Sequence, residues 1–89
     1  MTVIFLTTNG KKVSSQQVTA GLSSGTNSLS VLINDLSYVS DLVSAHFVAL
    51  SPAGLATING YSISPPNTVN LTVYTTQPTT ATIELLTID

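Results

Sequence analysis

Hydrophobic and polar residues alternate with a period of two along most of the chain, which is the pattern of β-strands with one buried face. Three segments show this alternation clearly, with Leu, Ile, Val or Ala at every second position: 28–34, 69–74 and 81–85. Two more segments are apolar enough to form strands: 2–8 and 43–50. A helical spacing occurs only in residues 34–42, which are too few for an independent helix and predict a loop or a single turn.

Turn residues separate these segments at intervals of roughly ten residues. Asn9-Gly10 and Asn59-Gly60 favour two-residue hairpin turns, and Pro52 favours a turn over residues 51–54. The Gly- and Ser-rich stretch 19–28 predicts a loop. We therefore predict an all-β fold, an antiparallel β-sandwich or jelly-roll-like barrel of about seven to eight short strands. The whole chain, 1–89, is expected to form a single β domain.

Charged residues make up only 7% of the chain, against roughly 25% in ordinary soluble domains. Fourteen threonines and twelve serines supply the polar surface instead. Neutral hydroxyls cost less to bury than charges, so such a surface suits permanent packing against a partner. The alternative is a Thr-rich β domain that tolerates few charges. Without cysteine the chain forms no disulfide, and association with other chains is the remaining way to stabilise so small a core.

Several classes of function are not expected. Lys11 and Lys12 are the only basic residues apart from the histidine, too few to bind nucleic acid. No apolar run reaches the length of about 18 residues that a membrane helix needs. The first twelve residues place their apolar run before the lysines, the reverse of a secretory signal. No cofactor-binding motif is present, so no cofactor is predicted.

His46 is the one histidine and the first candidate catalyst. Ser44 would lie roughly 6–7 Å away on the same strand face, and no acid is close in sequence. General acid–base chemistry needs both groups within hydrogen-bond reach, so we expect no enzyme and a packed or interface histidine. A calcium site at Asn34 and Asp35 with Asp41 is an alternative to turn formation. The spacing matches no known calcium loop, and no metal site is predicted.

Two groups of residues are candidates for binding. Tyr38, Tyr61 and Tyr74 could stack on sugars or pack at an interface. The strand over residues 2–8 is too apolar for an exposed edge, and we expect it to pair or exchange with a neighbouring chain. An ordinary inner strand is the alternative. The predicted interface residues are Val3, Ile4, Phe5, Leu6, His46, Tyr61 and Tyr74.

The C-terminal half carries a resemblance to a known group of proteins. "VSAHFVAL", "INGYSI" and "NTVNLTVYTTQPTTATIELLTID", within residues 43–89, resemble small all-β virion proteins of tailed bacteriophages. The resemblance implies a non-enzymatic building block without catalytic residues. Such proteins decorate and cement capsid shells, usually as trimers, or form modules of tails and fibres.

The expected function is therefore a capsid decoration, or cement, protein that oligomerises and stabilises the phage head shell. Its partners would be copies of itself, in a homotrimer, and the major capsid protein. It would be made in the host cytoplasm and reside on the virion surface. The start at Met1 favours a stand-alone decoration protein over an excised fibre tip. The alternative is a tail or fibre module that binds host carbohydrate as an adhesin.

Overall fold

The computed structural model describes the backbone of residues 2–6 and the whole of residues 10–89. Every regular element in this part of the chain is a β-strand, and it contains no helix. The strands are β1 (Thr2–Leu6), β2 (Lys12–Leu22), β3 (Gly25–Leu32), β4 (Asp41–Ser51), β5 (Ala56–Ser64), β6 (Thr68–Thr75) and β7 (Thr79–Ile88). The prediction of an all-β fold is confirmed.

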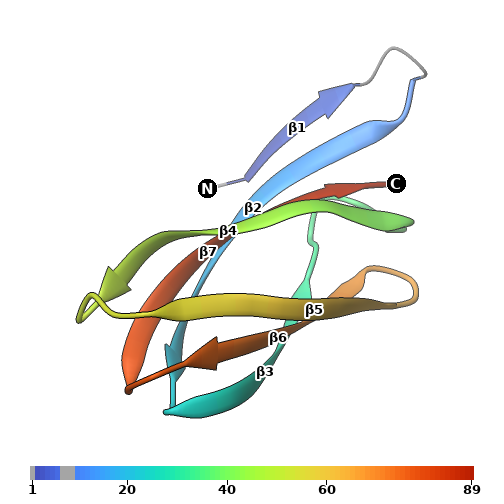
Figure 1. Cartoon of the computed structure of the whole chain (residues 1–89). Helices are drawn as coiled ribbons and strands as arrows, with labels where there is room; N and C mark the ends of the chain where they lie inside the picture. Colours follow the sequence, from blue (N-terminus) through green and yellow to red (C-terminus); the bar gives the residue numbers. More distant parts are fainter. Residues whose placement is uncertain (1, 7–9) are drawn as a thin grey trace.

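The strands form two antiparallel sheets, in the orders β1-β2-β7-β4 and β3-β6-β5 (Figure 1). Three strands of each sheet, β2 to β7 in total, surround one core, which is fewer than the seven to eight strands predicted. The short β1 extends the first sheet along the edge of β2. The count was too high for two reasons: residues 55–58 and 61–63, expected to be two short strands around the turn at Asn59-Gly60, are joined in one strand, β5, and β1 is paired only along the edge of β2.

The core contains residues from both sheets and from the loop between β3 and β4. Alternate residues of the central strands β6 and β7 point inward and are at most 1% exposed: Val69, Leu71, Val73, Ala81, Ile83 and Leu85. Each of these strands has a neighbouring strand on both sides. Its inward side chains therefore lie in the middle of the sheet, where the surrounding side chains cover them.

The loop over residues 33–40 contains a turn at residues 34–35 and no helix, in agreement with the loop or single turn predicted for residues 34–42. Its residues Ile33, Leu36 and Val39 are buried in the core. The side chain of Asn67 donates hydrogen bonds to the carbonyls of Ile33 (3.0 Å) and Leu36 (3.1 Å). The Val39 amide donates to the Pro66 carbonyl at 2.7 Å. The loop is therefore held against the connection between β5 and β6.

The predicted turn at Asn59-Gly60 and the predicted loop over residues 19–28 are wrong. Asn59-Gly60 lies inside β5, where the pairing with β6 shifts register between Ile58 and Gly60. The predicted loop 19–28 is mostly strand, because β2 pairs with β7 up to Leu22 and β3 pairs with β6 from Gly25. In both places the hydrogen bonds of a neighbouring strand outweigh a local preference for turns.

The expected hairpin between the first two strands is present as an antiparallel pair, with Leu6 opposite Lys12. Asn9 of the predicted turn lies outside the described residues, and Gly10 has a φ of 80°. β1 is an edge strand, so the alternative of an inner strand is wrong. β1 and the beginning of β2 lie together at one end of the molecule, away from the sheet β3-β6-β5 (Figure 1).

Candidate functional site

His46 lies on the outer face of β4, because its neighbours Ala45 and Phe47 pack against the core. The pairing of β4 with β7 places Glu84 directly opposite, and Nε2 of His46 is 3.5 Å from Oε1 of Glu84. The side chains are 58% and 35% exposed, respectively. Sequence reasoning missed this acid, because nothing local in either segment indicates that β4 pairs with β7.

Further hydroxyl groups lie on the same outer face of the sheet as this pair. Thr82 lies on the same face of β7 as Glu84, and its hydroxyl is 3.0 Å from that of Thr19 on β2. In the described part of the chain, no hydroxyl is hydrogen-bonded to the His46 imidazole. The arrangement supplies an acid but neither a bonded nucleophile nor the exclusion of water that acid–base catalysis uses.

β4 exposes two valines at irregularities in its pairing with β7. The register shifts between Leu42 and Ser44 and between Phe47 and Ala49, so Val43 and Val48 are the inserted residues of two β-bulges. They are 55% and 49% exposed. Each valine follows an inward residue, Leu42 or Phe47, and therefore points outward, and the bulge places a second residue on the outer face before the alternation resumes.

Tyr61 connects the two sheets at the open edge of β5. It pairs with Leu71 of β6, and its hydroxyl donates a 2.7 Å hydrogen bond to Oδ1 of Asp41, the first residue of β4. This hydrogen bond, and the negative charge of the carboxylate, raise the pKa of the Tyr61 phenol above its ordinary value of 10.0. Asp41 also accepts a hydrogen bond from the Leu42 amide at 2.8 Å, so its carboxylate is bonded both within β4 and to β5.

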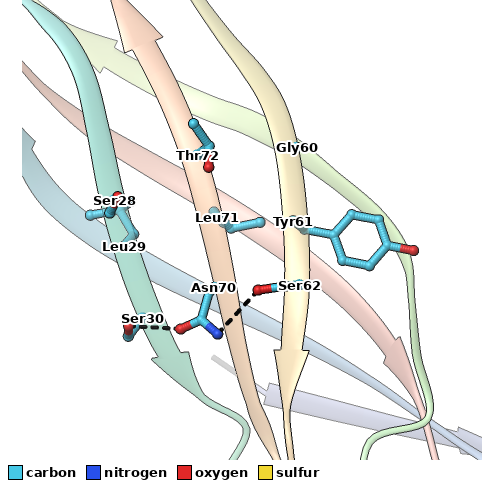
Figure 2. Close-up of a pocket in the computed structure, with 9 residues that line it drawn as sticks. All are labelled: Ser28, Leu29, Ser30, Gly60, Tyr61, Ser62, Asn70, Leu71 and Thr72. Carbon is cyan, nitrogen blue, oxygen red and sulfur yellow. Dashed lines mark hydrogen bonds between the residues drawn. The ribbon is translucent and has the colours of Figure 1, made fainter.

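A hollow of about 560 Å³ lies on the outer face of β3-β6-β5 (Figure 2). Its lining consists of Ser28, Leu29, Ser30, Gly60, Tyr61, Ser62, Asn70, Leu71 and Thr72. None of these residues carries a charge. The side chain of Tyr61 points away from the hollow, so this residue lines only its border (Figure 2).

The structure distributes the predicted interface residues over separate surfaces. Residues 3–6 belong to the edge strand β1, where only the backbone is described. His46 lies on the outer face of one sheet, whereas Tyr74 lies on the outer face of the other and is 40% exposed. Tyr61 is at the edge between them. The three tyrosines therefore do not form one platform, and the predicted residues do not form one patch.

The His, Asp and Glu side chains of the described residues are scattered over the molecule. No group of three or more His, Asp or Glu side chains there is placed to hold a metal ion. Of the residues considered for a calcium site, Asn34, Asp35 and Asp41, the last accepts hydrogen bonds from the Leu42 amide and the Tyr61 hydroxyl. No helix in this part of the chain has the length and hydrophobicity to cross a bilayer.

Comparison with known proteins gives no relative. No family model, no curated protein and no solved structure matches the chain.

Proposed function

We propose that the protein is a non-enzymatic structural virion protein, a capsid decoration protein that self-associates as a trimer and stabilises the head shell of a tailed bacteriophage. The observation that carries the proposal is the exposure of apolar side chains in a nearly uncharged chain. Large hydrophobic residues of the described part are 40–67% exposed: Leu32, Tyr38, Val43, Val48, Leu55, Tyr61 and Tyr74. Association with copies and with the major capsid protein would remove such surface from water.

The outer side of β4 is the proposed contact surface. Val43, Val48 and Ala49 are exposed there, and the charged groups among the described residues of this strand and its partner are the His46–Glu84 pair and Asp41 at the start of β4. Charge is depleted at the centres of protein interfaces, and this composition fits that pattern. The bulges have a second consequence, because they make the β4 edge unsuitable for regular strand pairing. Contact through side chains is therefore favoured at this surface.

The free edge of β1 is the proposed site of backbone pairing between copies. The pairing of β1 with β2 contains no register shift, and the opposite side of β1 has no neighbouring strand in the described sheets. An unbulged edge of this kind can accept a strand of another chain. Self-association through β1 would extend the sheet β1-β2-β7-β4 into the next copy.

We further propose that the two sheets form a β-sandwich of jelly-roll type. The proposal is supported by the order of pairing, in which β2 lies beside β7 and β3 beside β6. Of the six strands β2 to β7, the remaining two are β4 and β5, and they contact each other across the two sheets. This is the arrangement of a long hairpin rolled onto itself.

The assembly proposal is tested by measuring the mass of the purified chain by light scattering over a range of concentrations. We expect a particle of three chains, and we expect Val48→Lys to dissociate it. Thr26→Lys, on the outer face of the other sheet, adds the same charge at an exposed position and should leave the trimer intact. A wild-type chain that stays monomeric and folded at all concentrations would overturn the proposal.

The virion assignment needs its own experiment. Purified particles of the phage that encodes the chain should contain it, detected by mass spectrometry, and empty shells should bind the added protein. Val48→Lys should bind these shells more weakly than Thr26→Lys. A protein that is absent from particles and does not bind the shells is not a decoration protein.

A further inference from the structure

We propose that the hollow on the outer face of β3-β6-β5 binds an uncharged oligosaccharide, with Gly60 as its floor and Tyr74 as a stacking platform at one end. This site goes beyond the proposed function, since a decoration protein can assemble without it. It lies on the opposite sheet from the proposed contact surface of β4. Both activities could therefore be carried by one assembled particle.

The hollow is built from two successive rows of residues across the three strands. In one row Ser30, Asn70 and Ser62 lie side by side, and in the next Ser28, Thr72 and Gly60 do so. Figure 2 shows the side chains of Ser30, Asn70 and Ser62 linked across the face of the sheet. Their alternation with core residues of the same strands directs these rows outward.

Gly60 creates the depression in this surface. The register shift after Ile58 brings Gly60 opposite Thr72, where the alternation calls for an outward side chain. A Cβ atom placed on Gly60 would meet no other atom within 4 Å. The space above this glycine is therefore open and is not filled by a neighbour, which leaves room for a ligand beside Thr72 and Ser62.

The hydrogen-bonding groups around the hollow are aligned and only partly used. Ser30 donates to Oδ1 of Asn70 at 2.9 Å, and Nδ2 of Asn70 donates to the hydroxyls of Ser62 (3.4 Å) and Ser64 (2.8 Å). Each of these two serine hydroxyls accepts a bond from Asn70 and still has a proton to donate. Such hydroxyls act as donors and acceptors at once, as the hydroxyls of a sugar do.

Two further hydroxyls are available to a ligand. Within the described part of the chain, the hydroxyls of Ser28 and Thr72 form no hydrogen bond with a protein group. They lie in the same row as Gly60, with Thr72 on the neighbouring strand β6 and Ser28 on β3 beyond it. A ligand that extends along this row from Gly60 would replace solvent at both hydroxyls, and a polar neutral ligand can satisfy them.

The absence of charge selects the class of ligand. No Asp, Glu, Lys, Arg or His lines the hollow, so a phosphate, sulfate or carboxylate would lose hydration without gaining an opposite charge. An apolar ligand would leave the serine, threonine and asparagine groups without partners. A neutral oligosaccharide avoids both costs, because its hydroxyls can bond these side chains directly.

Tyr74 supplies the remaining feature of a sugar site. It follows Thr72 by two residues on β6, and its buried neighbours Val73 and Thr75 place it on the same outer face. Its side chain is exposed, with Thr26 and Thr57 on either side. An aromatic ring with one free face can pack against the C–H face of a sugar, while its hydroxyl remains in water. The proposed ligand therefore runs along β6 from Tyr74 toward Asn70.

The proposal is tested by screening the wild-type protein on a glycan array with neutral, sialylated and sulfated members. We expect binding of neutral glycans only. The best neutral glycan is then titrated against variants by calorimetry. Gly60→Val should weaken binding roughly tenfold or more, because its isopropyl group occupies the space above residue 60, and Tyr74→Ala should weaken it roughly three- to tenfold. Gly60→Val should not impair folding, because valine favours strands and its Cβ meets open space.

Matched controls separate loss of the site from general damage. Gly21→Val introduces the same side chain into β2, where a Cβ also meets nothing within 4 Å. Tyr38→Ala removes an exposed tyrosine of the loop between β3 and β4. Both variants should bind the glycan as the wild type does. The proposal is overturned if no neutral glycan binds, or if Gly60→Val and Tyr74→Ala bind as tightly as these controls.

This experiment is independent of the assembly proposal. Light scattering on Gly60→Val should give the same mass as the wild type, since the hollow is distant from β1 and on the opposite sheet from the exposed face of β4. A protein that binds glycan as a monomer retains the glycan site and loses the assembly proposal. A trimer that binds no glycan retains the assembly proposal and loses the glycan site.

Discussion

The hydroxyl of Tyr61 lies 2.7 Å from Oδ1 of Asp41, and this hydrogen bond joins β5 of one sheet to the start of β4 in the other. The two strands make no backbone ladder with each other. This side-chain hydrogen bond therefore links the two strands where no backbone pairing does, and it depends on the phenol keeping its proton.

Stability is expected to fall above pH 10 because of this bond. Asp41 raises the pKa of Tyr61 in the folded state above 10.0, first by accepting its proton in a hydrogen bond and second by its charge. Between these two pKa values the unfolded chain loses the phenol proton while the folded chain keeps it. The stabilisation is thus complete below pH 10 and is lost as the pH rises through the folded pKa.

Urea unfolding at about pH 8 and about pH 11 tests this expectation. Asp41→Asn removes the charge, and its stability should decrease less over this interval than that of the wild type. Tyr61→Phe, which has no proton to lose, should behave like Asp41→Asn. An equal decrease in all three proteins would show that Tyr61 does not cause it.

Thr87→Val is expected to stabilise the protein. Thr87 of β7 lies opposite Ser14 of β2, and neither of these buried hydroxyls has a hydrogen-bond partner among the described residues. Valine has nearly the same shape and removes one of these unsatisfied groups, so the free energy of unfolding should rise by about 1 kcal/mol. Thr82→Val is the control, because its hydroxyl is bonded to Thr19 and its loss should give no gain. A less stable Thr87→Val protein would indicate that the buried hydroxyls have a partner such as water.

Asn67→Ala is expected to loosen the loop over residues 33–40. The Asn67 side chain supplies two hydrogen bonds to this loop, and its removal leaves two partly buried carbonyls without that donor. The free energy of unfolding should fall by about 1–3 kcal/mol, and hydrogen exchange should accelerate at the Val39 amide. Asn59→Ala removes an exposed side chain that bonds only Thr57, and it should change stability by less than about 0.5 kcal/mol. Equal effects of the two substitutions would contradict this role of Asn67.

The His46–Glu84 pair is expected to contribute little to stability. Its atoms are 3.5 Å apart and the imidazole is 58% exposed, so water screens their attraction. His46→Ala and Glu84→Gln should each change the free energy of unfolding by less than about 1 kcal/mol. Denaturant titrations of both variants and of the double variant give the coupling between them. A coupling well above this value would mean that the pair is shielded from water, as in a covered interface.

The sequence by itself determined the β class and the positions of most strands. Side chains of a strand alternate between its two faces, so the spacing of Leu71 and Val73, or of Ile83 and Leu85, reports burial without knowledge of the partner strand. The connection over residues 33–40 was predictable for a similar local reason, since it is too short for an independent helix. The scarcity of charge was likewise visible in composition alone.

Tertiary structure decided everything that depends on which strands are neighbours. The pairing of β4 with β7 brings Glu84 to His46, and the shifted pairing of β5 with β6 turns the apparent hairpin turn at Gly60 into the floor of a hollow. The same pairing sends Tyr61 toward Asp41 and leaves Tyr74 on the opposite face. Hydrogen bonds between strands join residues far apart in the chain, and their register is fixed by the packing of the whole core. A local pattern therefore predicts which residues are buried, but not which residues meet.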